Sequence, residues 1–403
     1  MQRRILFVDD EPNLLMGLQR VLRPMRSVWE MQFVSSAEEA LRALANQTFD
    51  AVVTDMRMPG MTGAELLDKV REQSPHSVRI VLSGQSDRES ILQSIAPAHQ
   101  FLAKPCDPEL LKSVLKRALG LTDLLENEPL QRFISRLTCI PSLPLLFEEV
   151  TRELRSSEPS ASRLGELIAQ DMAMTAKLLQ MVNSAVYGVR AQVSEPKQAV
   201  LLLGLDTIQA MVLSLSIFSA FDPRLLGPVQ AERLWEHSVA VSASSRAIAE
   251  IEGIAGRALA PYRSAGLLHD IGKLIMAAAD PKEYRRIEDI AIATATDQCQ
   301  VEAQVWGCTH AQVGAYLLGI WGLPEAIVEA VAWSHNPSAS PVTEFSPLAA
   351  VHVASALDAQ VRPEYKQSDS EVDEVFLERI GLTNRLGLWK QRCAELAAAG
   401  RPE

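Results

Sequence analysis

The first 120 residues alternate short apolar runs with longer amphipathic stretches. Each apolar run has the length of a strand, and the stretches between them are long enough for helices. This alternation is typical of β/α units whose parallel strands form a doubly wound sheet. We therefore expect an α/β domain over residues 1–120. The expected strands are at residues 5–8, 31–34, 51–54, 79–82 and 100–103.

The hydrophobic pattern changes after the first 120 residues. Over residues 132–360 the apolar positions recur at three- and four-residue steps, as in amphipathic helices, and strand-like alternation is almost missing. We predict a second, all-α domain there, joined to the first by a helical linker over residues 121–131. Residues 361–403 begin with an acidic segment and end as an amphipathic helix. That helix is expected to pack on the second domain, with partner binding as the alternative.

Composition narrows the function classes. The 403 residues carry a formal net charge of −11 without a local basic patch, so direct nucleic-acid binding is not expected. The five cysteines show neither CxxC pairing nor the density of a disulfide scaffold, which favours a reducing cytoplasm. The N-terminus lacks a secretory signal, and the most apolar stretch is too interrupted by polar residues to cross a membrane. We expect a cytoplasmic protein.

Polar residues follow four of the expected strands. They are Asp9 and Asp10, then Asp55, Ser83 and Lys104. Because the carboxyl ends of parallel strands meet at one edge of a sheet, these side chains should converge. Crowded carboxylates repel one another unless a hard cation shares them, and oxygen ligands suit Mg²⁺. The pattern predicts a magnesium site.

Asp55 has the position of a nucleophile at this site. A carboxylate can attack a phosphoryl group when a metal and a fixed cation absorb the charge on the transferring oxygens. Pro59, Gly60 and Gly63 favour a tight loop directly after Asp55, and the main-chain carbonyl of Arg57 in that loop is a candidate metal ligand.

The segments ILFVDDEP, VVTDMRMPGMTG, VLSG and FLAKP together resemble the receiver domain of two-component response regulators, in order and in spacing. The resemblance covers about residues 1–120 and implies a flavodoxin-like fold. It implies that Asp10, Asp55 and the carbonyl of Arg57 bind Mg²⁺ directly, while Asp9 acts through water.

The same resemblance assigns the remaining receiver residues. Asp55 would accept a phosphoryl group from a sensor histidine kinase, and Ser83 and Lys104 would hold the phosphoryl oxygens. Phe101 occupies the position of the aromatic switch residue. Because phenylalanine lacks the hydroxyl of tyrosine, a switch here cannot use a hydrogen bond from the ring, but burial of the ring can still differ between states.

The first half of the helical region contains LIAQDMAMTAKLLQMVNSAVYG and AVLLLGLDTIQAMVLSLSIF. These segments resemble the HDOD domain, an output module related to HD-type phosphohydrolases. Asn183-Ser184 and Leu203-Gly204 are the points of resemblance. Taken alone, they would indicate only a helix end and a turn between helices.

The second half of the helical region carries five residues that suggest a metal site. Facing helices often assemble such sites, and in HD phosphohydrolases the metal activates water for attack on a phosphoester. One hypothesis is therefore a receiver-gated, metal-dependent phosphodiesterase acting on cyclic-di-GMP or a related phosphoester. The five residues are His237, His269, Asp270, His310 and His335.

Departures from the HD pattern favour the other hypothesis. Ser355 stands where a late acidic ligand is expected, and Asp358 lies one turn too far along. His335 is single where related hydrolases have paired histidines, and the GYP segment of cyclic-di-GMP phosphodiesterases is missing. We therefore predict that the HD site is vestigial, with no transition metal and no catalytic residue in the output domain.

The combined prediction is a phosphorylation-controlled regulator that is not an enzyme apart from phosphoryl uptake at Asp55. Mg²⁺ is its expected cofactor, and a sensor histidine kinase its expected upstream partner. The HDOD resemblance implies binding of a downstream signalling protein, either a kinase or a cyclic-di-GMP enzyme. The sequence leaves a homodimer open and gives no indication of membrane binding.

Overall fold

The computed structural model describes residues 2–74, 77–83, 100–104, 109, 111–112, 114–116, 119, 128–136, 145–154, 156, 158–170, 172–182, 193–220, 228–321, 323–361 and 371–399. The chain divides into two compact units, and the main division in the sequence falls after residue 142. We describe each unit by itself.

The first unit contains a five-stranded sheet in the order β2-β1-β3-β4-β5, with every neighbouring pair parallel. This confirms the predicted α/β fold. The first strand begins two residues earlier than expected, because the backbones of Arg3 and Arg4 pair with β2 despite their polar side chains. The strands are β1 (Arg3–Val8), β2 (Trp29–Val34), β3 (Ala51–Asp55), β4 (Val78–Ser83) and β5 (Gln100–Ala103).

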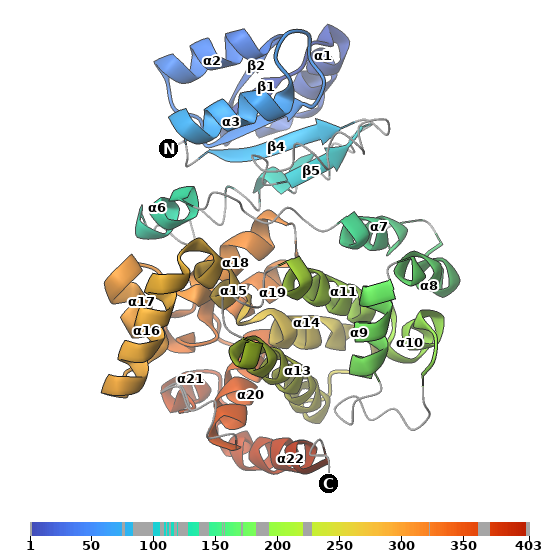
Figure 1. Ribbon diagram of the computed structural model, residues 1–403, viewed down its shortest axis with the longest axis vertical. Coiled ribbons are helices and arrows are strands. Elements are labelled where there is room, and N and C mark those ends of the chain that lie inside the picture. Colours follow the sequence, from blue (N-terminus) through green and yellow to red (C-terminus); the bar gives the residue numbers. More distant parts are fainter. Residues whose placement is uncertain are drawn as a thin grey trace. The chain divides into compact units, whose positions relative to one another are not determined.

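Both faces of this sheet are covered. Alternate residues of a strand point to opposite faces, so Leu6 and Val8 join one apolar core while Ile5 and Phe7 join the other. The first core includes α2 (Ala37–Asn46) and α3 (Gly63–Gln73), which Figure 1 shows along one face of the sheet. Leucines of α1 (Pro12–Val21) pack against the second core. Two-sided burial explains the unbroken apolar runs of β1 and β3, whereas the edge strand β2 keeps Glu30 exposed.

The start of α3 lies against the end of β3. Thr62 and Glu65 form a capping box, in which each side chain accepts a hydrogen bond from the backbone N–H of the other residue. A Cβ atom on Gly63 would lie 2.0 Å from the backbone oxygen of Asp55. Glycine at position 63 therefore allows the loop to turn closely around Asp55.

The rest of the described chain is helical, and no strand occurs among the described residues from 145 onward. This confirms the predicted all-α region. The helices are α6 (Glu128–Arg136), α7 (Leu145–Leu154), α8 (Ala161–Ala169), α9 (Met172–Val182), α10 (Pro196–Leu203), α11 (Leu205–Ala220), α13 (Pro228–Ile251), α14 (Ala260–Leu268), α15 (Ile271–Ala279), α16 (Pro281–Thr294), α17 (Gln298–Trp306), α18 (His310–Ile320), α19 (Glu325–Trp333), α20 (Pro347–Val361), α21 (Glu374–Arg379) and α22 (Leu386–Ala399).

Helix α13 is the centre of the second unit and packs against α14, α20 and α22 (Figure 1). The crossing with α14 is close, since a Cβ atom on Gly266 would lie 2.8 Å from the Cα atom of Ser242. Trp389 of α22 is fully buried and donates its indole N–H to Glu252, 2.9 Å away. The buried indole and its hydrogen bond hold α22 against the C-terminal end of α13.

The predicted domain limits stay predictions. Residue 120 and residues 362–370 lie outside the described residues, while α6 runs through residue 131 without a break. None of the helices in the described part of the chain combines the length and the apolar character needed to cross a bilayer.

Candidate functional site

Three carboxylates meet at the carboxyl edge of the sheet, where the sequence predicted a magnesium site. Asp9 and Asp10 directly follow β1, and Asp55 is the last residue of β3. One carboxylate oxygen from each of the three lies within 4.8 Å of the others. Asp9 is fully buried, and Glu11 donates its backbone N–H to the Asp9 carboxylate at 2.9 Å. The β1–β3 pairing brings the three residues together.

Lys104 joins this cluster directly after β5. Its Nζ lies 2.8 Å from the carboxylate of Asp9 and 2.7 Å from that of Asp55. Burial raises the pKa of Asp55, and the hydrogen bond from Lys104 opposes this rise. Burial alone would lower the pKa of Lys104, but hydrogen bonds to Asp55 and Asp9 raise it. Three carboxylates and one ammonium leave a net negative site of hard oxygen ligands, which fits Mg²⁺.

Other predicted receiver residues are placed only through the backbone. Ser83 ends β4 opposite Ala103 of β5, and Phe101 pairs with Val81. The side chains of Ser83 and Phe101 lie outside the described residues, as do Asn183 and Ser184. Their predicted roles, and that of the Arg57 carbonyl, stay predictions.

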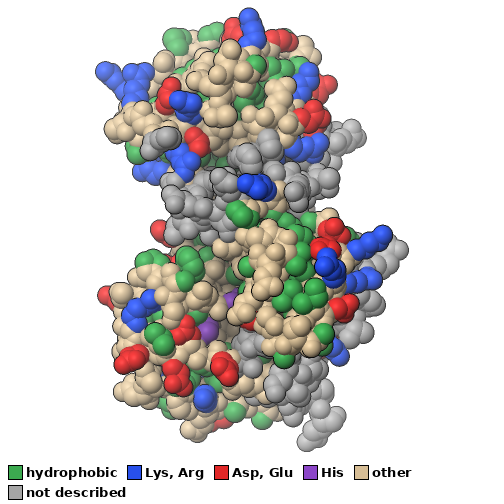
Figure 2. All heavy atoms as spheres, turned by 90° about the vertical axis from the view of Figure 1, so that its left-hand side faces the viewer, with side chains coloured by type: hydrophobic (Ala, Val, Ile, Leu, Met, Phe, Trp, Pro, Cys, Tyr) green, Lys and Arg blue, Asp and Glu red, His purple; other side chains and the backbone are tan. Residues whose placement is uncertain are grey.

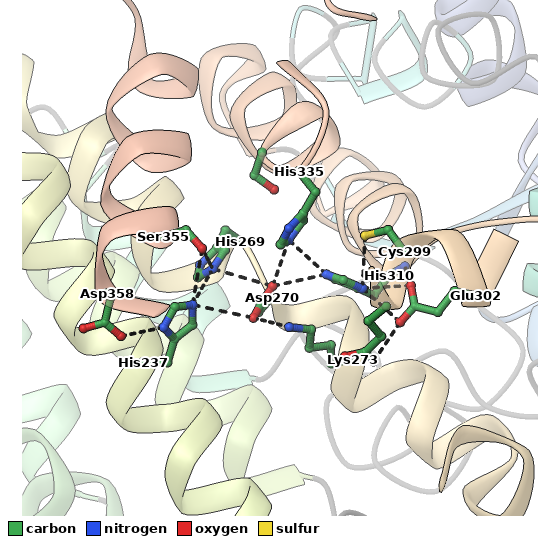
Figure 3. A network of polar contacts seen from close by, with 12 residues as sticks. His237, His269, Asp270, Lys273, Cys299, Glu302, His310, His335, Ser355 and Asp358 are labelled. Atoms are coloured by element: carbon green, nitrogen blue, oxygen red, sulfur yellow. Dashed lines mark hydrogen bonds and ion pairs between the residues drawn. The ribbon is translucent and has the colours of Figure 1, made fainter. Parts of the chain in front are cut away.

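The five residues of the predicted HD site lie together in the second unit, around Asp270 (Figure 3). Asp270 Oδ1 lies 3.2 Å from His310 Nε2, 3.3 Å from His335 Nε2 and 3.6 Å from His269 Nε2. Asp270 Oδ2 is 4.0 Å from His237 Nε2. The residues come from α13, from the α14–α15 junction, from the start of α18 and from the segment directly after α19.

His237 and His269 form the first of two groups that share Asp270. Their Nε2 atoms are 3.2 Å apart, and Ser355 Oγ is 3.4 Å from each. Nδ1 of His269 donates to the carbonyl of Gly266 at 2.9 Å, and Nδ1 of His237 donates to Asp358 at 2.7 Å. Each Nδ1 is thus engaged by an acceptor, and the two Nε2 atoms face the same point. This arrangement suits a cation.

Asp358 has a role that the sequence did not indicate. We expected it to lie too far along α20 to be a ligand, and it contacts the Nδ1 atom of His237 rather than the Nε2 atom. Asp358 therefore orients His237, while Ser355 faces the convergence point of the Nε2 atoms with a neutral hydroxyl.

His310 and His335 form the second group. Their Nε2 atoms are 3.0 Å apart. The carboxylate oxygens of Glu302 lie 2.8 and 3.0 Å from Nδ1 of His310, and one of them also accepts the His310 backbone N–H at 2.7 Å. Cys299 Sγ is 3.8 Å from His310 Nδ1. Cys299, His310 and His335 each offer a ligand atom within 4.8 Å of the others.

A buried ion pair sets the charge of the cluster. Lys273 Nζ lies 2.6 Å from Asp270 Oδ2, and both residues are buried. Burial works against ionisation of Asp270, but the ammonium of Lys273 and hydrogen bonds from His310 and His335 lower its pKa well below the usual value. Burial lowers the pKa of His269 to about 3, so its ring is neutral. Burial would also lower the pKa of Lys273, but the carboxylate of Asp270 raises it.

Three residues of this network were missed by the sequence analysis. Lys273 follows Asp270 by three positions in HDIGK, and this helical spacing was an available signal. Cys299 and Glu302 have the same spacing on α17. Their contact with His310 depends on how α17 meets the start of α18, and no sequence pattern indicated it.

A neighbouring histidine outside both groups, His352, is expected to make the stability of the second unit depend on pH. Nδ1 of His352 donates to the carbonyl of Ser334 at 2.7 Å, and its Nε2 accepts the backbone N–H of Asp373 at 2.8 Å. Burial lowers the pKa of His352 to about 4. Between this pKa and the unfolded value of about 6.5, the unfolded chain binds more protons than the folded chain. This contribution is complete above pH 6.5 and is lost as the pH falls.

We therefore expect a His352→Gln variant to lose less stability than the wild type between pH 6.5 and 4.5, by up to about 1.4 kcal/mol per pH unit. Urea unfolding monitored by circular dichroism at several pH values measures this difference. Parallel pH profiles for the two proteins would show that His352 does not titrate differently on unfolding.

Comparison with known proteins matches both parts of the chain. Residues 5–116 match the response regulator receiver domain family, and residues 140–337 match the HDOD domain family. The hydrogenase transcriptional regulatory protein HoxA of Cupriavidus necator is 35% identical over 161 residues, which cover 39% of this chain and 32% of HoxA. The chain thus spans about a third of the length of this curated relative.

Two solved structures are similar to the separate parts. The signal receiver domain of an HD domain-containing protein from Pseudomonas fluorescens is 32% identical, and the match covers 30% of this chain and 96% of that chain with a TM-score of 0.28. An HDOD domain protein of unknown function from Geobacter sulfurreducens is 23% identical, with coverage of 68% and 96% and a TM-score of 0.55. The second similarity concerns the fold alone.

The N-terminal sheet, its acidic edge and the family match define the class of protein, which is a response regulator. The chain belongs to the response regulators that join an N-terminal receiver domain to a C-terminal HDOD output domain.

Proposed function

We propose that this response regulator takes up a phosphoryl group from a sensor histidine kinase on Asp55 and signals by binding another protein through its HDOD domain. The observation that carries the proposal is the position of Lys104 between Asp9 and Asp55, 2.8 and 2.7 Å from their carboxylates. Such a cluster provides a nucleophile and a fixed cation side by side.

The residues at the carboxyl edge of the receiver sheet would have different roles in phosphoryl transfer. Mg²⁺, held directly by Asp10, Asp55 and the main-chain carbonyl of Arg57 and through water by Asp9, would neutralise charge on the phosphoryl oxygens. An oxygen of Asp55 would attack the phosphorus as its bond to the kinase histidine breaks, leaving an acylphosphate on the receiver. Lys104 would exchange its contact with Asp55 for a contact with a phosphoryl oxygen.

The HDOD domain is proposed to act without turnover. Lys273 already neutralises one oxygen of Asp270 at 2.6 Å, and the first histidine group has Ser355 where a catalytic metal would need a further carboxylate. A phosphodiesterase centre therefore lacks a ligand in this group. The downstream partner is proposed to be a signalling protein, with a kinase, a cyclic-di-GMP enzyme and a second copy of the chain as the classes to test.

We also propose that the protein acts in the cytoplasm. Cys299, Cys308 and Cys393 are free thiols in the described part of the chain, and thiols of this kind persist in a reducing compartment.

Phosphorylation with acetyl phosphate and Mg²⁺ tests the receiver part of this proposal. We expect one acylphosphate per chain in the wild type, and an Asp55→Asn variant should show about 100-fold less or none, because the amide is not a nucleophile. Intact-protein mass spectrometry measures the modification. Asp68→Asn, on the outer side of α3, is the matched control and should be modified like the wild type. Equal modification of Asp55→Asn and wild type would exclude Asp55 as the acceptor.

Incubation with cyclic-di-GMP and Mn²⁺ tests the HDOD part. No hydrolysis above the buffer rate is expected in either phosphorylation state. If the wild type hydrolyses cyclic-di-GMP and a His269→Ala variant does not, the HDOD domain is a receiver-gated phosphodiesterase. The proposal that it acts without turnover would then be wrong.

A further inference from the structure

The outer edge of the receiver sheet is open along β2, the first strand in the order of the sheet. A groove of about 380 Å³ touches four consecutive residues of this strand, residues 30–33. Consecutive side chains of a strand point to opposite faces, so a groove that reaches all four runs along the edge of the sheet. Gln19 of α1 and Gln47, directly after α2, also line it.

The backbone groups of β2 that face away from β1 have no partner. The hydrogen bond from the N–H of Arg3 to the carbonyl of Val28 sets the alternation of the parallel ladder, in which the even-numbered residues of β2 bond to β1. The odd-numbered residues, Trp29, Met31 and Phe33, therefore direct their N–H and C=O groups outward. Within the part of the chain that the structure describes, no hydrogen bond engages these groups.

Strand β2 also lacks the features that usually block an open edge, which are proline, lysine or a bulge. Its sequence is WEMQFV, and its register with β1 is unbroken over all six residues. The single charged residue, Glu30, is neutralised by the guanidinium of Arg4 at 2.9 Å. The edge can therefore accept a further strand without burying an unpaired charge.

We propose that β2 of a second copy of the chain occupies this groove. The two strands would run antiparallel about a two-fold axis at Met31, and the two receiver sheets would join into one. In this register Met31 lies opposite Met31 of the second copy, and Trp29 lies opposite Phe33. All the outward-facing residues then form hydrogen-bonded pairs, each of which exchanges two N–H···O bonds.

The side chains fit this register. Glu30 lies opposite Gln32 of the second copy. The side chain of Gln32 accepts a hydrogen bond from Gln47 through Oε1 at 2.8 Å, so its Nε2 is available to donate to Glu30 across the pair. The odd-numbered side chains, which share the other face of the sheet, meet as an apolar set. An axis one residue earlier would place two Glu30 carboxylates opposite each other, which is unfavourable.

An exposed apolar side chain lies beside the groove. Met16 of α1 is 59% exposed and precedes Gln19 by one helical turn. A two-fold axis perpendicular to the sheet keeps both α1 helices on one face, so Met16 of each copy lies beside the joint. On the face that Figure 2 shows, the N-terminal unit (top) carries small groups of hydrophobic side chains among charged ones. Backbone hydrogen bonds therefore have to supply much of the specificity of the contact.

The proposed pairing is independent of phosphoryl uptake and of partner binding by the HDOD domain. The free edge belongs to β2, whereas Asp55 ends β3 and Lys104 follows β5. Dimerisation and acylphosphate formation can therefore be measured separately, and failure of one does not imply failure of the other.

Analytical ultracentrifugation of the unphosphorylated full chain tests the proposal. The wild type should form a dimer whose fraction rises with concentration. Met31→Pro removes an outward N–H at the axis but no ladder bond to β1, and it should weaken dimerisation about 10-fold or more. Met31→Val keeps the N–H and is the matched control, which should dimerise like the wild type. Circular dichroism checks that both variants are folded.

Oxidative cross-linking gives a second readout that does not require the proline variant to fold. Met31→Cys places two thiols at the axis, where the Cα atoms of a hydrogen-bonded antiparallel pair are about 5.5 Å apart, within reach of a disulfide. Glu30→Cys is the matched control. Its thiol is more exposed, but the two Cα atoms would be about 8 Å apart, too far for a disulfide. Peptide mass spectrometry distinguishes these links from those of native cysteines.

Three results would overturn the proposal. The first is a wild type that stays monomeric at its highest soluble concentration, which would leave the edge to a strand of another protein. The second is a folded Met31→Pro variant that dimerises like the wild type. The third is a Glu30→Cys variant that cross-links as readily as Met31→Cys.

Discussion

Replacement of Asp270 by asparagine should destabilise the helical domain by about 3–5 kcal/mol in the presence of EDTA, because it breaks a buried ion pair from one side. Lys273 is only 7% exposed, and its Nζ lies 2.6 Å from the Asp270 carboxylate. A neutral amide would leave the ammonium without its nearest counter-charge at a largely buried position. Urea unfolding followed by circular dichroism measures the loss, and EDTA excludes any contribution from bound metal.

A double variant separates the charge from the packing. Asp270→Asn combined with Lys273→Met removes both charges and should recover most of the lost stability. Asp289→Asn, an exposed change on α16, should stay within about 0.5 kcal/mol of the wild type. If Asp270→Asn unfolded at the same urea concentration as the wild type, Asp270 could not be the group that holds Lys273 charged.

The fold could be predicted where the local hydrophobic pattern is the one that the tertiary structure requires. The apolar runs of the receiver correspond to its five strands, and the central strand β3 is buried throughout, since a parallel sheet covered on both faces needs apolar residues at consecutive positions. The start of β1 was missed because Arg3 and Arg4 enter the sheet through backbone hydrogen bonds, which hydropathy does not report. The all-α character of the output domain follows from its helical period in the same way.

The two candidate sites differ in how much of each could be predicted from the sequence. Parallel pairing brings strand ends to one edge, so the sequence placed Asp9, Asp55 and Lys104 in one polar site without further information. The histidine cluster needed the family resemblance to collect its members from separate helices. Neither the strand pattern nor the family resemblance indicated Glu302 and Asp358, which contact the Nδ1 atoms of histidines in the cluster. These contacts depend on how the helices pack.

Close helix packing is itself testable at Gly272. A Cβ atom at this position would lie 1.9 Å from the backbone oxygen of His310 and 2.9 Å from the backbone nitrogen of Gly314. Both contacts are to backbone, so a rotamer change cannot relieve them and α15 must move away from α18. We expect Gly272→Ala to destabilise the helical domain by about 3 kcal/mol or more, although alanine is the better helix former.

The same displacement should reach the histidine cluster around Asp270, because Gly272 is two residues from Asp270 and lies against the backbone of His310. Thermal unfolding of the full chain should show the output-domain transition about 6–12 °C lower. Gly387→Ala in α22 is the matched control, since nothing lies within 4 Å of a Cβ atom there, and it should leave the transition unchanged or raise it. If both variants unfolded at the same temperature, α15 and α18 could not be in backbone contact at Gly272, and the placement of His310 beside Asp270 would need another cause.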